Sequence, residues 1–163
     1  MSRKATLSHL AGLGEPVVIV AVTDQKSCDR LIRAGARQAQ DMGVGLKVVS
    51  VQPFAFLGLE LGLNLDYLYG IAKEYGAEMS VFYHDDPLQM IGAYIRRHNT
   101  RLLIAGTTPG GYEGQFISEL RRAFPKQPVC LVDPDGLLYD LTPLAFTRGR
   151  ARPPKLRPAT EAE

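Results

Sequence analysis

A glycine-rich segment in the second half of the chain is the strongest candidate for binding chemistry. Residues 106–111 read Gly-Thr-Thr-Pro-Gly-Gly, and Gly114 and Gln115 follow shortly after. Glycines allow close approach of the backbone, and the free N–H groups at the start of a helix attract anions. A phosphate could therefore bind here. The alternative is a glycine turn that only joins a strand to a helix, and the residues themselves leave both interpretations open.

A second polar segment, Thr23-Asp24-Gln25-Lys26-Ser27, directly follows the first long apolar run of the chain. Neither segment contains the P-loop pattern GxxxxGK[ST], and no GxGxxG pattern follows the apolar run. These absences exclude P-loop NTPase chemistry and the standard dinucleotide fingerprint. Asp24 is the only clear acidic candidate for a magnesium ligand or general base in these segments, so the sequence indicates no catalytic residues.

His84-Asp85-Asp86 could form a metal site or an acid/base cluster. Pro87 follows directly, and acidic residues before a proline are typical of a helix start, where carboxylates accept the unpaired backbone N–H groups. We favour helix capping and predict no metal site. Cys28 lies near a predicted helix start and is either a modestly reactive thiol or an inert small residue. Cys130 lies inside an apolar run and is predicted to be a core residue.

The elements that must position these segments follow from the hydrophobic pattern. Continuous apolar runs predict strands at residues 16–22, 46–51, 77–83, 101–105 and 128–132. Helical periodicity predicts helices at residues 24–41, 63–75, 85–98 and 115–124. This alternation predicts a Rossmann-like α/β fold, with one open five-stranded parallel sheet and helices on both faces. Ligands of such sheets bind at the carboxyl ends of the strands, where the strand order reverses.

The first predicted helix has one apolar and one basic face. Leu31, Gly35 and Met42 share the face expected to be buried, whereas Arg30 and the other arginines of the segment lie opposite. We therefore expect Arg30 to face solvent.

The strand, loop and helix patterns together resemble the universal stress protein family. The resemblance covers about residues 16–133 and rests on three segments, 22–27, 103–108 and 127–132. It is most specific toward the universal-stress-like domain in sensor kinases of bacterial potassium-uptake operons, through Arg30-Leu31-Ile32-Arg33, Asp85-Asp86 and Arg97-His98-Asn99. The resemblance implies the strand order 3-2-1-4-5, and it implies a homodimer in which the edge strand at residues 128–132 pairs between subunits.

Many members of that family bind ATP or AMP, and the resemblance places the ligand between the ends of strands one and four. It implies that Thr23 and Asp24 face the base and that Val51 and Gln52 line it. It also implies a phosphate cradle formed by Gly106, Thr107, Gly110, Gly111, Gly114 and Gln115.

This sequence departs from the pattern of the ATP-binding members, which is Gly-x2-Gly-x9-Gly-Ser/Thr. Pro109 occupies the third position after Gly106, the loop is shorter, and Gln115 replaces the hydroxyl residue. Proline has no N–H to donate, and a short loop cannot wrap a triphosphate. We predict a non-catalytic regulatory or ligand-sensing module that binds an adenine nucleotide weakly. The alternatives are a slow ATP hydrolase or nucleotidyl transferase, and a protein-interaction module without nucleotide.

The length of 163 residues predicts one domain, at residues 16–133, with extensions at 1–15 and 134–163. Residues 148–163 hold five of the 19 Lys and Arg residues and two of the 17 Asp and Glu residues. The remaining 14 basic and 15 acidic residues leave the body almost neutral, so the net charge of +2 comes from this tail. The tail is rich in proline and arginine and is predicted to be disordered.

The sequence also gives expectations about partners and compartment. Segment 54–69, from Phe54 to Tyr69, is more apolar than one helix face requires, so it either contacts a protein partner or packs locally. Nucleic acid is not expected, since the basic tail has no interleaved aromatic residues. No signal peptide or membrane span is apparent, and two isolated cysteines fit a reducing compartment, so the predicted location is the cytoplasm.

Overall fold

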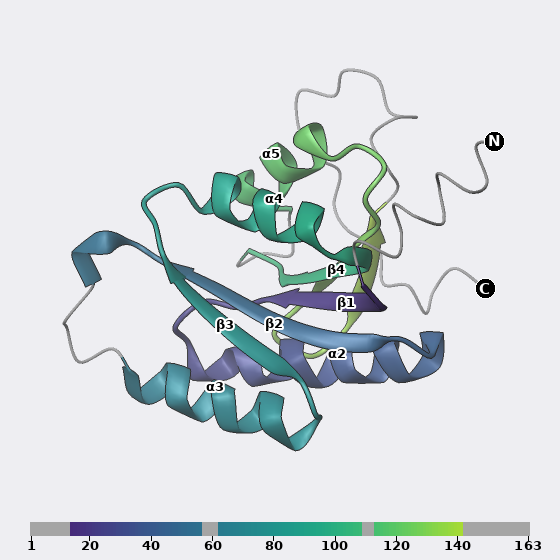
Figure 1. Cartoon of the computed structure of the whole chain (residues 1–163), viewed down its shortest axis with the longest axis horizontal. Helices are drawn as coiled ribbons and strands as arrows, with labels where there is room; N and C mark the ends of the chain where they lie inside the picture. The colour runs from purple at the N-terminus through teal and green to yellow at the C-terminus, as the bar shows by residue number, and fades with distance from the viewer. Residues whose placement is uncertain (1–13, 57–61, 109–112, 142–163) are drawn as a thin grey trace.

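The computed structural model describes residues 14–56, 62–108 and 113–141, and these form a six-stranded sheet between two layers of helices (Figure 1). The strands are β1 (Pro16–Ala21), β2 (Gly45–Gln52), β3 (Glu78–Tyr83), β4 (Asn99–Gly106), β5 (Val129–Val132) and β6 (Leu138–Leu141). The helices are α2 (Asp29–Met42), α3 (Gly62–Glu74), α4 (Pro87–Arg97) and α5 (Gln115–Ala123), with 3-10 turns η1 (Lys26–Cys28) and η2 (Phe54–Phe56).

The sheet has the order β3-β2-β1-β4-β5-β6. The first five strands are parallel and follow the predicted order 3-2-1-4-5. The prediction of five strands is wrong, because β6 pairs antiparallel with β5. The sheet therefore extends beyond the domain boundary predicted at Asp133.

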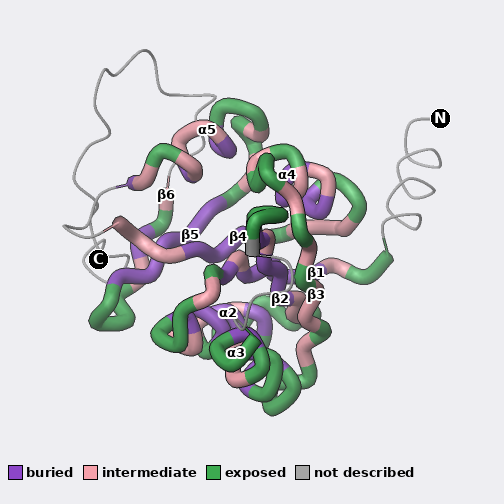
Figure 2. Tube along the Cα trace, turned by 90° about the vertical axis from the view of Figure 1, so that its left-hand side faces the viewer, coloured by how far each residue is buried: buried purple, intermediate pink, exposed green. Residues whose placement is uncertain are grey.

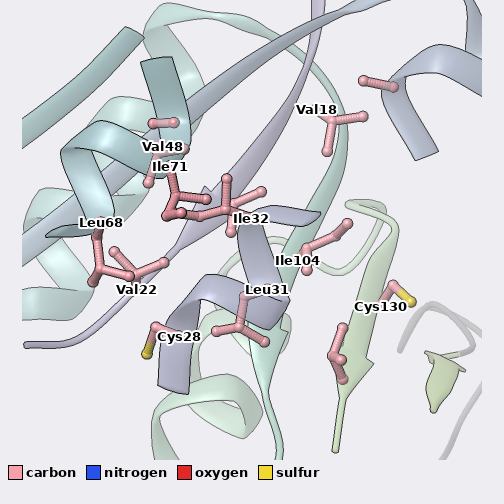
Figure 3. Close-up of a cluster of buried hydrophobic side chains, with 14 residues drawn as sticks. Val18, Val22, Cys28, Leu31, Ile32, Val48, Leu68, Ile71, Ile104 and Cys130 are labelled. Atoms are coloured by element: carbon pink, nitrogen blue, oxygen red, sulfur yellow. The ribbon is translucent and has the colours of Figure 1, made fainter. Parts of the chain in front are cut away.

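The two faces of the sheet bury two separate apolar clusters. Side chains alternate along β1, so that Val18 and Val20 pack under α2 and α3, whereas Val17 and Ile19 pack under α4 and α5. Figure 1 shows these helix pairs on opposite sides of the sheet, and Figure 2 shows the buried strands between them. The cluster on the α2 and α3 side, drawn in Figure 3, includes Val18, Ile32, Val48 and Leu68.

Cys130 belongs to the same cluster as Val18 and Ile32. Burial raises the pKa of its thiol to about 12, with the Asp140 carboxylate adding to the rise. The prediction that Cys130 is a core residue is confirmed.

Several helix ends form as their residue types predict. Gly43 and Gly76 both have φ of +69°, in the left-handed region that glycine tolerates. Gly43 ends α2, and Gly76 lies just after the last residue of α3. The Asp86 side chain accepts a 3.1 Å hydrogen bond from the N–H of Gln89, which confirms it as the cap of α4.

The other two residues of the His84-Asp85-Asp86 cluster also have structural contacts. His84 Nδ1 accepts from the Asp86 N–H at 2.9 Å, and Asp85 accepts from the Phe54 N–H at 3.0 Å. Hydrogen bonds within the loop and to the turn η2 therefore account for all three side chains. No metal-binding group of three ligands occurs in the described residues.

The start of the first helix differs from the prediction. Residues 22–28 form a loop and the turn η1, and α2 begins only at Asp29. Gln25 is extended, with φ of −133°, and its carbonyl accepts the N–H of Cys28 at 3.0 Å. This loop lies directly after β1, so it occupies the carboxyl end of the sheet.

The turn between β5 and β6 is organised by Asp133. Its Oδ1 accepts the N–H groups of Asp135 and Leu137, and its Oδ2 accepts the Tyr139 hydroxyl, each at 2.9 Å. Gly136 has φ of +87°, which completes the reversal. Burial acts to raise the pKa of the Asp133 carboxyl, but these hydrogen bonds outweigh it and lower the pKa below its ordinary value of 3.8.

We expect Asp133→Asn to reduce the loss of stability that occurs when the pH is lowered. A carboxyl whose pKa is lower in the folded chain stabilises the fold above its unfolded pKa, and this contribution is lost as pH falls through the folded pKa. Urea unfolding at pH 6 and pH 3 should show a smaller loss for Asp133→Asn than for the unsubstituted chain. At pH 6 the variant should be less stable by about 1 kcal/mol, since amide groups bind more weakly than carboxylates. Asp135→Asn, at an exposed position of the same turn, is the control; equal acid losses for Asp133→Asn and the unsubstituted chain would contradict this account.

The structure also bears on the expected partner surfaces. The expectation that residues 128–132 form a sheet edge is wrong, because β6 covers that side of β5. The homodimer itself stays a prediction. Within segment 54–69, Phe54, Leu63 and Tyr69 are 52, 81 and 54% exposed, whereas Leu65 and Leu68 are buried, so the segment contributes to both core and surface.

Some of the predicted features fall on parts of the chain that the structure leaves undescribed. Residues 57–61 of the apolar segment and the predicted tail 148–163 lie outside the described residues. Among the described helices, none is long and apolar enough to cross a membrane.

Candidate functional site

A cavity of about 780 Å³ opens at the carboxyl ends of β1 and β4. These strands are neighbours in the sheet, but the chain leaves β1 toward α2 on one face and leaves β4 toward α5 on the other. The two loops therefore diverge, which is the arrangement that creates binding crevices in open α/β sheets. The volume lies within the range of small-molecule sites.

The walls combine the loop after β1, the end of β4, and the first turns of α2, α4 and α5. The lining residues are Ala21, Val22, Thr23, Gln25, Ser27, Cys28, Arg30, Leu31, Val51, Pro87, Ile91, Ala105, Gly106, Thr107, Thr108, Gly114, Gln115, Phe116, Ile117 and Pro134.

Six of the ten predicted site residues line this cavity: Thr23, Val51, Gly106, Thr107, Gly114 and Gln115. Asp24 and Gln52 are not among the lining residues. The Gln52 side chain is buried and donates to Ser50 Oγ at 2.9 Å, which uses its amide within the sheet. Gly110 and Gly111 lie outside the described residues. The structure thus brings the ends of β1 and β4 together as predicted, with Asp24 in the loop beside the cavity and Gln52 inside the sheet.

Two buried oxygen atoms near the cavity have no hydrogen-bond partner among the described residues. One is Oγ1 of Thr107, which lines the cavity, and the other is Oδ1 of Asp24 in the adjacent loop. Buried polar atoms normally have partners, so an unpaired hydroxyl in a cavity wall is a candidate ligand contact.

The first turn of α5 provides backbone groups to the same cavity. Gly114 is the N-cap residue and no side chain caps the helix, so the N–H groups of the first turn are not taken by a capping side chain. A Cβ at Gly114 would lie 2.9 Å from Cγ2 of Thr108, so a larger residue here would have to displace the Thr108 side chain. The Gln115 amide donates to Glu119 at 3.0 Å, so it is engaged along the helix surface.

A buried ion pair fixes the residue before this helix. Arg121 Nη1 lies 2.9 Å from both carboxylate oxygens of Glu113, and the two residues are 8 and 9% exposed. Glu113 directly precedes Gly114, so the ion pair links the segment before α5 to the second turn of that helix.

Sequence reasoning missed Arg30, which is half-buried and lines the cavity. Its Nε donates to the carbonyl of Asp133 at 2.9 Å and its Nη1 donates to the carbonyl of Ser27 at 2.7 Å. The observed start of α2 at Asp29 explains the error, because it places Arg30 in the first helical turn beside the carboxyl edge of the sheet. Among the described lining residues, Arg30 alone carries a formal charge at neutral pH.

Cys28 is buried and its Sγ lies 3.4 Å from Oγ1 of Thr23. It lines the cavity beside Leu31, and it also belongs to the core cluster in Figure 3. The structure therefore gives Cys28 a packing role, and the modest reactivity considered from the sequence stays a prediction.

Comparisons with known proteins identify the class of fold. No protein-family model and no curated protein matches the chain. Among solved structures, the chain is similar to a universal stress protein from Archaeoglobus fulgidus, with 20% identity and a TM-score of 0.54 over 71% of this chain and 96% of that one. The same Archaeoglobus fulgidus protein in complex with dAMP is 19% identical, covering 71% and 95% of the two chains at a TM-score of 0.54. A universal stress protein in complex with cAMP is 17% identical, covering 72% and 98% at a TM-score of 0.54. The described chain therefore has the fold of the universal stress proteins.

Proposed function

We propose that this chain is a non-catalytic, universal-stress-like regulatory module that senses an adenine nucleotide. The cavity between the ends of β1 and β4 carries the proposal, because it joins apolar walls to backbone and hydroxyl groups that suit a phosphate. Val22, Leu31 and Val51 offer apolar contact to a base, whereas Thr107 and the first turn of α5 offer hydrogen bonds.

The solved structures with this fold support an adenine ligand. Two of them hold dAMP and cAMP, and both of these ligands carry a single phosphate group. The shortened glycine segment and Pro109 of this chain also favour a monophosphate over a triphosphate, so AMP is the ligand that we propose. The motifs at residues 30–33, 85–86 and 97–99 extend the proposal to the regulatory class of potassium-uptake sensor-kinase domains.

The proposal is tested by thermal unfolding of the purified chain with AMP, ADP and ATP, each with and without magnesium. A ligand at 100 times its Kd that binds only the folded state should raise the Tm of a protein of this size by roughly 5–10 °C. We expect AMP to give the largest shift, without a requirement for magnesium. GMP at equal ionic strength controls for nonspecific effects of phosphate and salt.

Gly106→Val tests the location of the site. A Cβ at Gly106 would lie 3.5 Å from Arg30 Nη2 and 3.7 Å from Cδ1 of Leu31, which are ordinary contacts that the fold tolerates. The further methyl groups of valine would narrow the cavity, and the AMP-dependent rise in Tm should disappear. No shift of the unsubstituted chain at millimolar AMP would refute the proposed function, and an undiminished shift in Gly106→Val would refute the site.

A further inference from the structure

We propose that Arg30 recognises the anionic group of the ligand and makes the site selective for a nucleoside monophosphate over the neutral nucleoside. This inference rests on the proposed function and adds to it the residue that reads the ligand's charge. Three observations support it: the hydrogen bonds that hold the Arg30 side chain, the position of that side chain in the cavity, and the lack of other charged residues in the described lining.

The Arg30 guanidinium is held by backbone carbonyls rather than by a carboxylate. The carbonyls of Asp133 and Ser27 accept from Nε and Nη1, and they come from segments that lie far apart in the sequence. Two anchors on different segments fix the plane of the guanidinium. They take two of its five N–H donors, so further donors are left for a ligand.

The positive charge of Arg30 has no ionic partner among the described residues, whose salt bridges join Lys47 to Glu78 and Arg121 to Glu113. Arg30 does bond to one acidic residue, Asp133, but through the backbone carbonyl of that residue. The Asp133 carboxylate accepts from the N–H groups and the hydroxyl of the β5–β6 turn. The cavity therefore contains a fixed cation that a bound anion would neutralise.

The free end of the guanidinium lies beside the other anion-binding groups. Nη2 would be 3.5 Å from a Cβ at Gly106, the last residue of β4. Thr107 follows with its buried, unpaired hydroxyl, and Gly114 begins α5 in the same cavity wall. All three groups line the same cavity, and the proposal places the anion of the ligand against the guanidinium.

The charge of the Arg30 guanidinium explains the expected selectivity for AMP over adenosine. A guanidinium binds phosphate through two parallel hydrogen bonds, and such charge-assisted bonds are stronger than neutral ones. A neutral nucleoside would remove water from the guanidinium without replacing it by an anion, which is unfavourable in an apolar cavity. AMP should therefore bind more tightly than adenosine, although both share the base and the sugar.

The test is calorimetric titration of the full chain with AMP and with adenosine. We expect AMP to bind at least about 10-fold more tightly than adenosine. Arg30→Gln should weaken AMP binding by about 10- to 100-fold and leave adenosine binding nearly unchanged, so that the two ligands become equal. Arg30→Lys should give an intermediate loss, because it keeps the charge but not the planar fork. Arg37→Gln, at an exposed position of the same helix, removes the same charge outside the cavity and should change neither affinity.

The outcomes separate this inference from the proposed function. If neither AMP nor adenosine binds, the proposed function fails and this inference fails with it. If both bind equally, or if Arg30→Gln weakens both to the same extent, the inference is overturned while the proposed function stands. Should Arg30→Gln fail to fold, the salt dependence of the unsubstituted chain decides: added NaCl should weaken AMP binding and spare adenosine, and equal responses would overturn the inference.

Discussion

Replacement of Glu113 by leucine is expected to lower the free energy of unfolding by about 3–5 kcal/mol at pH 7. The substitution leaves the Arg121 guanidinium buried at 8% exposure without its carboxylate. A guanidinium cannot lose its proton at any accessible pH, so the chain cannot offset the loss of the Glu113 carboxylate by neutralising Arg121. The loss should appear as a lower midpoint in urea unfolding followed by far-UV circular dichroism.

Arg121→Met removes the other partner and leaves the Glu113 carboxylate buried without this guanidinium, so it should also lower the free energy of unfolding. The double variant, Glu113→Leu with Arg121→Met, has neither charge and should lie within about 1–2 kcal/mol of the unsubstituted chain. A double variant whose loss equals the sum of the two single losses would show that the pair is not energetically coupled, and would contradict this account.

Replacement of Gly35 by alanine is expected to destabilise the chain by about 2–3 kcal/mol, although alanine favours helices. Gly35 lies in α2 where the helix crosses the sheet. A Cβ at this position would overlap Cγ2 of Val20 and lie 3.2 Å from Cδ1 of Leu46. Because Val20 is a branched, fully buried residue of the central strand, the helix itself must move away from the sheet.

Gly70→Ala is the matched control for this effect. Gly70 lies in α3 and is exposed, and a Cβ added there would have no neighbouring atom within 4 Å, so alanine should stabilise the chain by about 0.5–1 kcal/mol. Val20→Ala provides a rescue, because it removes the overlapping atom. Urea unfolding should give the double variant a smaller loss than the two single losses added together. A Gly35→Ala chain as stable as the unsubstituted one would show that α2 is not held closely against β1.

The first five strands could be predicted because the residues of each form an apolar run that is typical of a buried strand. β1 reads as a continuous apolar run, and both of its faces are indeed covered by helices. β6 was not predicted, because it has only four residues, of which only Tyr139 is buried. So short a segment shows no hydrophobic periodicity. The turn residues Pro134-Asp135-Gly136 were the available signal, since this combination is typical of a chain reversal.

The candidate site could be predicted in position but only partly in its residues. Strand order alone places the loops after β1 and β4 together, which correctly brought Thr23 and Gly106 to one cavity. Arg30 could not be found in this way, because it is held by the carbonyl of Asp133, which lies 103 residues further along the chain. Such a contact depends on the folded sheet, and the helical period instead assigned Arg30 to the solvent face.

The measurement that most directly tests the central claim is a titration of the 15N-labelled chain with AMP, followed through the amide signals of each residue. We predict progressive, saturable shifts that are largest for Thr23, Gly106, Thr107 and Gly114, with the Gly106→Val chain showing none. Shifts that cluster instead on α3 or β3, or no shifts at millimolar AMP, would contradict the assignment of this cavity as an adenine-nucleotide site.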